Sequence, residues 1–418
     1  MNYFFRNILT LSFGIGASQL IVFVAQLVLR RLFTPEEFGA FDVYFSIFGI
    51  LVVIAALRYE MAIVLPKTDD KASNLLVLSI LFSFAFNILI FLLIFFNKNG
   101  ISRLLNFPDK YSEWLFLLPL TTFFFSSYQA INYWLIRKKA FRLSSFNKIA
   151  RRGIEGTTQV TFGYLKYSYG LVIGDLFGNL LNFIVGFTQL FRQKFSLKFI
   201  SKGNLLYVFK RYIEFPKYNL IPGLLNTLST ALPFLIINKF YGGATTGYFG
   251  LSKMVLAIPV ALISTAVSQV LFQRITEKRN SGISIKQDIY RIVLYLGCLG
   301  IAGILVFSLW GVELLTFLFD ETWRRSGEFI QIIVFASMIN FVVSPLSIIF
   351  VALEKIKIQA IWQTGYFLLI ICLFLFKHLD IVDFLYVYVA IDGLSYIAYF
   401  MVIKRVLTQY EYGLMKNN

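Results

Sequence analysis

Histidine and cysteine are nearly absent from this 418-residue sequence. It contains a single histidine, His378, and two cysteines, Cys298 and Cys372, which both lie in apolar stretches. The cysteines do not indicate a disulfide framework, and one histidine does not support a histidine-based metal or catalytic centre. We therefore expect no cofactor, no metal site and no catalytic residues, and we predict that the protein is not an enzyme.

Other absences argue against further classes of protein. The sequence has no Gly-x-x-x-x-Gly-Lys-Ser/Thr loop, so it is not expected to hydrolyse ATP. Short alternating strands, the signature of an outer-membrane barrel, are missing as well. The segments between the apolar stretches are too short to hold an outer domain. This argues against a membrane glycosyltransferase or polymerase, which we expect to present its catalytic residues on a sizeable loop.

Long apolar runs dominate what is present. Hydrophobic residues make up 58% of the sequence and the mean hydropathy is +0.73, whereas soluble domains contain about 45–50% apolar residues. A helix needs about 20 apolar residues to cross the hydrocarbon core of a membrane. Runs of this kind are expected to span the membrane at residues 8–29, 43–64, 73–97, 113–136, 148–165, 169–190, 213–238, 246–271, 288–309, 328–350, 357–376 and 384–403. The predicted fold class is an all-α membrane protein with about twelve transmembrane helices.

The positive charges alternate between the segments that connect these spans. Most of the 39 Lys and Arg residues fall in every second segment, beginning with the one that holds the N-terminus. Because positively charged loops resist translocation, this side is predicted to be cytoplasmic, with both termini on it. The net charge of +17 is then explained mostly by topology, and no nucleic-acid partner is expected.

The chain is predicted to divide after the sixth span into two lobes, residues 1–204 and 205–418. Phe-Gly-Ala-Phe at residues 38–41 and Thr-Gly-Tyr-Phe at residues 246–249 occupy equivalent places, 208 residues apart, at the outer start of spans two and eight. Each half begins and ends inside. The halves are therefore expected to be parallel six-helix bundles related by a pseudo-two-fold axis along the membrane normal.

Several segments of the sequence are similar to those of bacterial polysaccharide exporters. They are Thr34-Pro35-Glu36-Glu37-Phe38-Gly39 after the first span, residues 57–67, residues 212–216 with Asn226 downstream, residues 269–274, and Trp323 with residues 327–331. The chain thus resembles an O-antigen or capsule oligosaccharide-lipid flippase of the Wzx type, within the multidrug/oligosaccharidyl-lipid/polysaccharide exporter superfamily. The resemblance implies two six-helix bundles that alternate between inward-open and outward-open states.

The same resemblance implies a function. An undecaprenyl-pyrophosphate-linked oligosaccharide would cross the bacterial inner membrane, coupled to an ion gradient, for surface polysaccharide synthesis. Its partners would be this substrate, membrane lipids and other polysaccharide-assembly membrane proteins. The alternative is a cation-coupled drug or small-molecule antiporter of the same superfamily, which we would expect to carry an acidic lumen.

Positive side chains inside the spans are candidates for binding an anionic headgroup, because charges at membrane depth are costly and usually functional. Arg58 is placed in the second span and Lys253 in the eighth, while Arg30 and Arg31 lie at the outer end of the first. Arg58 has two alternatives, which are pairing with a distant carboxylate and snorkelling to the cytoplasmic headgroups. Glu60 lies two residues further along the predicted helix, on its opposite side, and is therefore not expected to face Arg58. Arg30 and Arg31 have the alternative of anchoring the span at the interface.

Polar and acidic residues in the spans complete the candidates. Asn226, Gln129, Asn132 and Asn182 belong to a group of polar residues that could line a cavity and meet sugar hydroxyls, or could join helices by hydrogen bonds instead.

Three acidic residues are candidates for ion coupling. Asp392, near the middle of the twelfth span, is the deepest carboxylate and could bind and release a proton, or form an internal ion pair. Asp175, within Gly174-Asp175-Leu176-Phe177-Gly178, is a second candidate that is equally suited to helix packing. Glu155 is the third, and it could pair simply with Arg151 four residues earlier.

Overall fold

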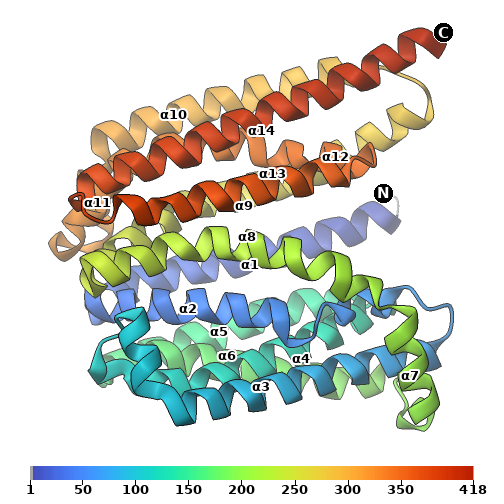
Figure 1. The fold of residues 1–418 in the computed structure, drawn as a ribbon, viewed down its shortest axis with the longest axis horizontal. Coiled ribbons are helices and arrows are strands. Elements are labelled where there is room, and N and C mark those ends of the chain that lie inside the picture. The colour runs from blue at the N-terminus through green and yellow to red at the C-terminus, as the bar shows by residue number, and fades with distance from the viewer. Residues whose placement is uncertain (1–2, 418) are drawn as a thin grey trace. The chain divides into compact units, whose positions relative to one another are not determined.

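The structure, a computed structural model, describes the backbone of residues 3–417, and the side chains of residues 16–264 and 266–414. Helices account for nearly all of the described chain, and no strand occurs in residues 3–417 (Figure 1). The chain forms two compact units, residues 1–247 and 248–418. The first five residues of helix α9 belong to the N-terminal unit and the rest of that helix to the C-terminal unit.

The N-terminal unit contains eight helices and the start of a ninth within the described residues. They are α1 (Tyr3–Leu32), α2 (Pro35–Ala55), α3 (Asp69–Leu105), α4 (Leu117–Arg137), α5 (Phe141–Tyr164), α6 (Gly170–Arg192), α7 (Lys202–Arg211), α8 (Glu214–Tyr241) and α9 (Gly243–Asn280), with 3₁₀ segments at Tyr59–Val64, Asp109–Phe116 and Leu197–Phe199. Local sequence fixes several boundaries. Thr34 caps α2 in a capping box with Glu37, and Pro35 is the first helical residue.

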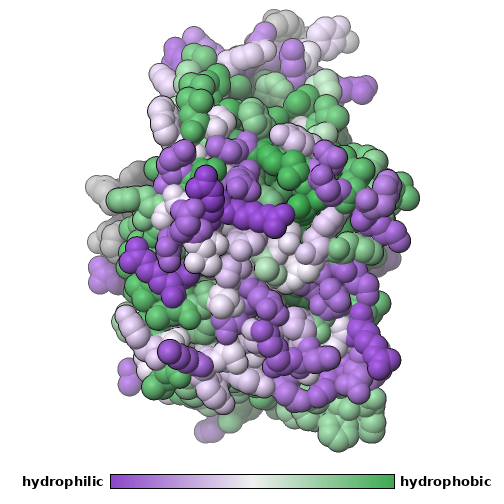
Figure 2. All heavy atoms as spheres, turned by 90° about the vertical axis from the view of Figure 1, so that its left-hand side faces the viewer, coloured by the Kyte–Doolittle hydropathy of each residue, from purple (hydrophilic) through white to green (hydrophobic). Residues whose placement is uncertain are grey.

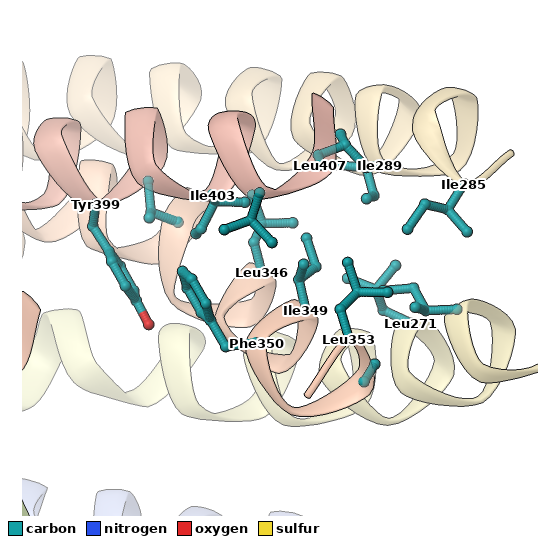
Figure 3. Close-up of a cluster of buried hydrophobic side chains, with 14 residues drawn as sticks. Leu271, Ile285, Ile289, Leu346, Ile349, Phe350, Leu353, Tyr399, Ile403 and Leu407 are labelled. Atoms are coloured by element: carbon teal, nitrogen blue, oxygen red, sulfur yellow. The ribbon is translucent and has the colours of Figure 1, made fainter. Parts of the chain in front are cut away.

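The C-terminal unit contains the remainder of α9 and five further helices. They are α10 (Lys286–Phe319), α11 (Arg324–Val343), α12 (Ile348–Ala352), α13 (Ile356–Ile371) and α14 (Ile381–Asn417), with 3₁₀ segments at Glu321–Trp323, Ser344–Ser347 and Cys372–Phe376. Its core gathers aliphatic side chains from five helices, α9, α10, α11, α12 and α14, among them Leu271, Ile289, Ile349 and Ile403 (Figure 3). This packing fixes α9 against α14, and both helices carry candidate site residues.

Each of the twelve predicted spans coincides with a helix or with two or three consecutive helical segments. Within the described residues, ten helical segments are long and apolar enough to cross a membrane. α1 and α5 are the other two helices at predicted spans, with 30 and 24 residues, and α5 carries several charges. The predicted fold class is confirmed. The division into lobes at residue 204 concerns the sequence repeat and stays a prediction, whereas the compact units meet at residue 247.

The surface agrees with a membrane setting. Large apolar side chains stand exposed along the helices, such as Leu89 and Phe96 on α3 and Leu305 on α10. A soluble protein rarely exposes so many. Viewed end-on to the helices, hydrophilic residues are frequent between apolar patches (Figure 2). We conclude that the protein is a multi-pass membrane protein.

Candidate functional site

Lys253 lies inside the C-terminal unit, about 15 Å along α9 by helical rise. Its Nζ donates a hydrogen bond of 2.9 Å to the hydroxyl of Tyr388 on α14, and it lies 5.4 Å from the centroid of the same ring. The lysine is half-buried. A tyrosine, rather than a carboxylate, is therefore the direct hydrogen-bond partner of this cation.

Asp392 stands one turn after Tyr388 on α14 and is 2% exposed. Its Oδ1 accepts a hydrogen bond of 2.8 Å from Tyr366 on α13, and its Oδ2 accepts a longer one of 3.4 Å from Tyr388. Both carboxylate oxygens thus accept from tyrosine hydroxyls. The structure brings together Lys253, predicted to bind substrate, and Asp392, predicted to couple ions, in one chain that runs through Tyr388.

Aromatic rings enclose this chain on the side of α13. Trp362 stacks on Tyr366 with ring centroids 5.2 Å apart and on Tyr399 with centroids 3.9 Å apart. Its indole N–H donates to the carbonyl oxygen of Ser395. The rings hold Tyr366 in place and exclude water from Asp392, and hydrogen bonds are electrostatically stronger in such a low-dielectric setting.

The chain of hydrogen bonds has a defined direction. Lysine only donates, an ionised carboxylate only accepts, and the tyrosine hydroxyl does both. While Asp392 is ionised, its negative charge can therefore balance the positive charge of Lys253 through the Tyr388 hydroxyl. Neutralising Asp392 with a proton or another cation would leave the positive charge of Lys253 without this counter-charge.

A second charged cluster lies in the N-terminal unit, between α5 and α6. Arg151 forms an ion pair of 3.2 Å with Asp175, which is fully buried and also accepts from Asn179. Arg152 donates from Nη1 to both oxygens of Glu155 at 2.7 Å, whereas the Arg151–Glu155 distance is 3.9 Å. The expected pair between Arg151 and Glu155 is thus present, but the closer partner of Glu155 is Arg152.

Two glycines permit this cluster. A β-carbon on Gly174 would lie 2.9 Å from the Glu155 carbonyl oxygen, and one on Gly178 would lie 3.0 Å from the Glu155 β-carbon. Only glycine lets α6 approach α5 this closely. The Gly174–Gly178 pattern therefore serves helix packing and at the same time carries Asp175 to Arg151.

Arg58 is not in a membrane-spanning helix, which corrects the sequence interpretation. α2 ends at Ala55, and Leu57 and Arg58 adopt positive φ angles of 51° and 64° before the 3₁₀ segment Tyr59–Val64. This turn brings Arg58 Nη1 to 4.0 Å from Glu60 Oε1. The expectation that the two side chains face apart was wrong, because it assumed that the helix continues through them.

The guanidinium of Arg58 lies against the backbone of Gly223 on α8, where a β-carbon would overlap Nη2. Its Nε and the Oε2 of Glu60 are buried, and neither has a hydrogen-bond partner among the described atoms. The pair is therefore loose, and both groups keep hydrogen-bonding capacity. Arg58 stays a candidate for substrate contact, but it lies in the turn after α2 and against α8, and not within a membrane-spanning helix as expected.

The two arginines at the end of α1, Arg30 and Arg31, lie in different surroundings. Arg30 is 4% exposed, donates to Gln26 and to the Gly247 carbonyl oxygen, and lies 3.5 Å from the centroid of the Phe38 ring. Arg31 is exposed. Arg30 thus joins α1, α2 and the start of α9, as a structural anchor does. Both arginines stay predicted candidates for substrate contact.

Asn226 is exposed on α8, and its carbonyl oxygen is within reach of the Thr230 hydroxyl. No described contact joins Asn226 to Arg58 or to the arginine–carboxylate cluster of the same unit. Three other polar candidates lie together in the structure. Gln129, Asn132 and Asn182 all line one cavity of the N-terminal unit.

Sequence reasoning missed three basic residues of that cavity, Lys148, Arg151 and Arg152. They were assigned to a cytoplasmic connecting segment because they continue a run of positive charges. The structure begins α5 at Phe141, so all three lie well inside the helix. Their spacing, which places Lys148 on the helix face of Arg151 and Arg152, was the available signal. Among the residues with described side chains, no group of three His, Cys, Asp or Glu could hold a metal ion.

Comparisons with solved structures define the fold. An inward-facing multidrug resistance MATE family transporter of the MOP superfamily matches with a TM-score of 0.72 at 14% identity, over 94% of this chain and 96% of its own. The lipid II flippase MurJ in an inward closed conformation matches with a TM-score of 0.75 at 13% identity, over 97% and 90%. The chain therefore has the two-lobed fold of these transporters.

Sequence comparison gives the family. The model of the polysaccharide biosynthesis protein family matches residues 28–328, and the chain belongs to this family. An uncharacterized membrane protein in the cps region of Klebsiella pneumoniae is 20% identical over 81% of this chain and 68% of its own length. The teichuronic acid biosynthesis protein TuaB of Bacillus subtilis is 19% identical over 38% and 33%.

Proposed function

We propose that this protein moves an undecaprenyl-pyrophosphate-linked oligosaccharide from the inner to the outer leaflet of the bacterial cytoplasmic membrane, with both termini in the cytoplasm. The lobes would be the two sequence repeats, and the product would serve synthesis of an O-antigen or a capsule. Membership of a polysaccharide biosynthesis family and a fold shared with a lipid II flippase support this proposal.

The observation that carries the proposal is the chain Lys253–Tyr388–Asp392. A cation at membrane depth suits an anionic headgroup, and the described hydrogen bonds connect Lys253 through the Tyr388 hydroxyl to the carboxylate of Asp392. When an ion neutralises Asp392, Lys253 becomes available to the diphosphate. When the ion leaves, the ionised carboxylate of Asp392 again balances the charge of Lys253 through Tyr388. Lys253 then binds the diphosphate less strongly, and the headgroup is released.

A membrane potential that is negative inside acts on this substrate in the required direction. Moving one charge across 100 mV is worth about 2.3 kcal/mol, so the export of a dianionic diphosphate gains about 4.6 kcal/mol. Ion binding at Asp392, with Asp175 and Glu155 as further candidates, would then set the order of the steps. No ATP hydrolysis is required.

Arg58 and Asn226 are proposed to contact the substrate on the N-terminal unit. Arg58 retains a donor without a partner at Nε, and arginine can hold a phosphate through two parallel hydrogen bonds. Arg30 and Arg31 have a smaller part in this proposal, because Arg30 is already engaged with Gln26, Phe38 and Gly247.

The test is genetic and chemical. Deleting the gene should abolish surface polysaccharide, and lipid-linked oligosaccharide should accumulate in the inner leaflet. The full-length protein supplied on a plasmid should restore both, whereas the Lys253→Ala variant should insert in the membrane and restore neither. Accumulation in the outer leaflet, or normal surface polysaccharide after deletion, would refute the proposal.

A drug or small-molecule antiporter is the second candidate, favoured by the fold shared with a MATE family transporter. Such a protein would export cationic dyes against a gradient. The positive side chains at Lys253 and around Arg151 are poorly suited to a cationic substrate. Dye efflux by cells that overproduce the protein, with unchanged surface polysaccharide in the deletion strain, would select this second function instead.

A further inference from the structure

We propose that the N-terminal unit holds a phosphate-class anion in a cavity between α1, α4, α5 and α6, apart from the chain at Lys253. The proposed ligand is the diphosphate of the lipid-linked substrate, an assignment that rests on the proposed function. The existence of an anion site at this place rests on the cavity alone.

The cavity has a volume of about 290 Å³. Pockets that enclose whole drug-sized ligands measure about 300–1,000 Å³, so this one suits a headgroup but not an oligosaccharide. Its walls are polar on three helices, with Gln19 from α1, Gln129 and Asn132 from α4, and Asn182 from α6. A site with these dimensions would take the diphosphate and leave the sugars and the polyprenyl chain outside.

Three cations from α5 complete the walls. Lys148, Arg151 and Arg152 lie about 10, 15 and 16 Å from the start of the helix by helical rise. Only two carboxylates, Asp175 and Glu155, pair with them. The cluster therefore keeps one excess positive charge at membrane depth, where a charge is costly unless it serves a function.

Lys148 carries this excess. No described carboxylate lies within ion-pair distance of its ammonium group, whereas Arg151 and Arg152 both have acidic partners. The lysine is only half-buried and faces the cavity. An anion bound there would be held mainly by Lys148, with the two arginines adding to the positive potential.

One buried donor of the cavity residues also lacks a partner. The Nε of Arg151 has no hydrogen-bond partner among the described atoms. A buried donor without an acceptor destabilises the fold, and such groups are rare in native proteins. Phosphate oxygens are strong acceptors, so a diphosphate would satisfy this donor together with Lys148.

The competing interpretation is a purely structural ion network that joins α5 to α6. It accounts for Asp175, Glu155 and the two arginines, but it gives no role to Lys148. Lys148 therefore distinguishes the two interpretations, and it belongs to no described ion pair whose loss would disturb packing.

The experiment measures binding of inorganic pyrophosphate to the full chain in nanodiscs by isothermal titration. We expect binding to the wild-type protein, and at least a tenfold weaker affinity for Lys148→Gln. Arg142→Gln is the matched control, since Arg142 is an exposed cation one and a half turns earlier on the same helix. It should bind as the wild type does. Absent binding, or equal affinity in Lys148→Gln, would overturn the proposal.

Tyr128→Phe provides a second variant in case Lys148→Gln does not fold. It removes one hydroxyl from the cavity wall and keeps the ring, so we expect a three- to tenfold loss of pyrophosphate affinity. Geranylgeranyl diphosphate should compete with pyrophosphate at the same site, and inorganic sulfate should compete less. Failure of geranylgeranyl diphosphate to compete would reject the diphosphate of a lipid as the ligand.

The outcome is separable from that of the proposed function. If the deletion strain accumulates lipid-linked oligosaccharide in the inner leaflet but Lys148→Gln binds pyrophosphate normally, the flippase function stands and this site is wrong. If pyrophosphate binding depends on Lys148 while the deletion strain has normal surface polysaccharide, the anion site stands and the flippase function is wrong.

Discussion

Gly39 of α2 lies so close to Gly243, the first residue of α9, that a β-carbon on Gly39 would overlap the Gly243 carbonyl oxygen. The contact is reciprocal, because a β-carbon on Gly247 would overlap the carbonyl oxygen of Pro35, the first residue of α2. Gly243 follows Pro35 by 208 residues, and Gly247 follows Gly39 by the same number.

This contact, which we call the α2–α9 seam, agrees with the predicted sequence repeat. If the two halves are repeats, equivalent residues contact each other's backbone here, as expected across a two-fold axis. Each helix begins with the same local pattern, since the N–H of Phe38 bonds to Thr34 and that of Thr246 bonds to Gly242. Glycine is required at Gly39 and Gly247 because the backbones of α2 and α9 approach each other too closely there for a β-carbon.

Gly39→Ala should therefore destabilise the protein. The extra methyl group would force α2 and α9 apart at their first turns, and overpacking of this kind typically costs about 1–3 kcal/mol. We expect a melting temperature several degrees lower in detergent, with reduced surface polysaccharide. Gly49→Ala on the same helix is the control, because its β-carbon would lie 3.5 Å from Thr227, an ordinary contact. Equal stability of the two variants would contradict this role for the seam.

The fold was predictable from the sequence because its dominant signal, the length of the apolar runs, is local. Whether a segment can span the membrane depends on the length and hydropathy of that segment alone. The break after Ala55 was not predictable in this way. The run at residues 43–64 stays apolar through the turn at Leu57 and Arg58, so hydropathy cannot distinguish a helix from a turn followed by a 3₁₀ segment.

The candidate site was predictable only in part. Lys253 and Asp392 stood out as single charges in apolar runs, and the structure places them on either side of Tyr388. Lys148 and Arg151 were hidden because a neighbouring run of cations explained them by topology. Tyrosines gave no signal at all, since the sequence contains 23 of them and only tertiary packing selects Tyr366 and Tyr388.

Removing the hydroxyl that joins Lys253 to Asp392 should impair transport. Tyr388→Phe keeps the ring beneath the lysine but leaves a buried cation and a buried carboxylate without their common partner. Loss of such a hydrogen bond costs about 1–3 kcal/mol, which corresponds to a fall in transport rate of roughly five- to 150-fold. Surface polysaccharide measured in a complemented deletion strain would report the change.

Tyr386→Phe is the matched control for that variant, because Tyr386 is an exposed tyrosine on the same helix. It should support normal surface polysaccharide. If Tyr388→Phe also does so at equal protein levels, the hydroxyl does not connect Lys253 to Asp392 in function.

Asp392→Asn should weaken the dependence of transport on the ion gradient. Asparagine keeps the size of the side chain and an acceptor for Tyr366, but it has no charge to balance Lys253 and no site for a proton. Transport in vesicles should continue at a lower rate and respond less to a collapse of the pH gradient than the wild type does. A response identical to that of the wild type would count against coupling at this residue.

Gly223→Ala tests the position of Arg58 separately from its charge. The new methyl group would overlap the Arg58 guanidinium, which is the end of a flexible side chain and can move aside while the fold is kept. If Arg58 binds substrate where it lies, Gly223→Ala should reduce surface polysaccharide nearly as much as Arg58→Ala does. Gly203→Ala, whose β-carbon meets nothing within 4 Å, is the control. Full activity in Gly223→Ala would show that this position of Arg58 is not required.

The orientation in the membrane can be tested at the two ends of one helix. Lys139 precedes α5 and Lys166 follows it, both exposed and both at turns with positive φ. The 24 residues between these turns span about 36 Å, enough to cross the hydrocarbon core. Single cysteines are introduced at each position after Cys298 and Cys372 have been replaced.

A membrane-impermeant thiol reagent applied to intact cells with a permeable outer membrane should label Lys166→Cys but not Lys139→Cys. The reason is the run of cations around Lys139, which resists translocation and keeps that end of α5 in the cytoplasm. Permeabilising the inner membrane should make both cysteines reactive, which controls for a buried thiol. Labelling of Lys139→Cys in intact cells would reverse the topology, and with it the direction of transport that the positive charges imply.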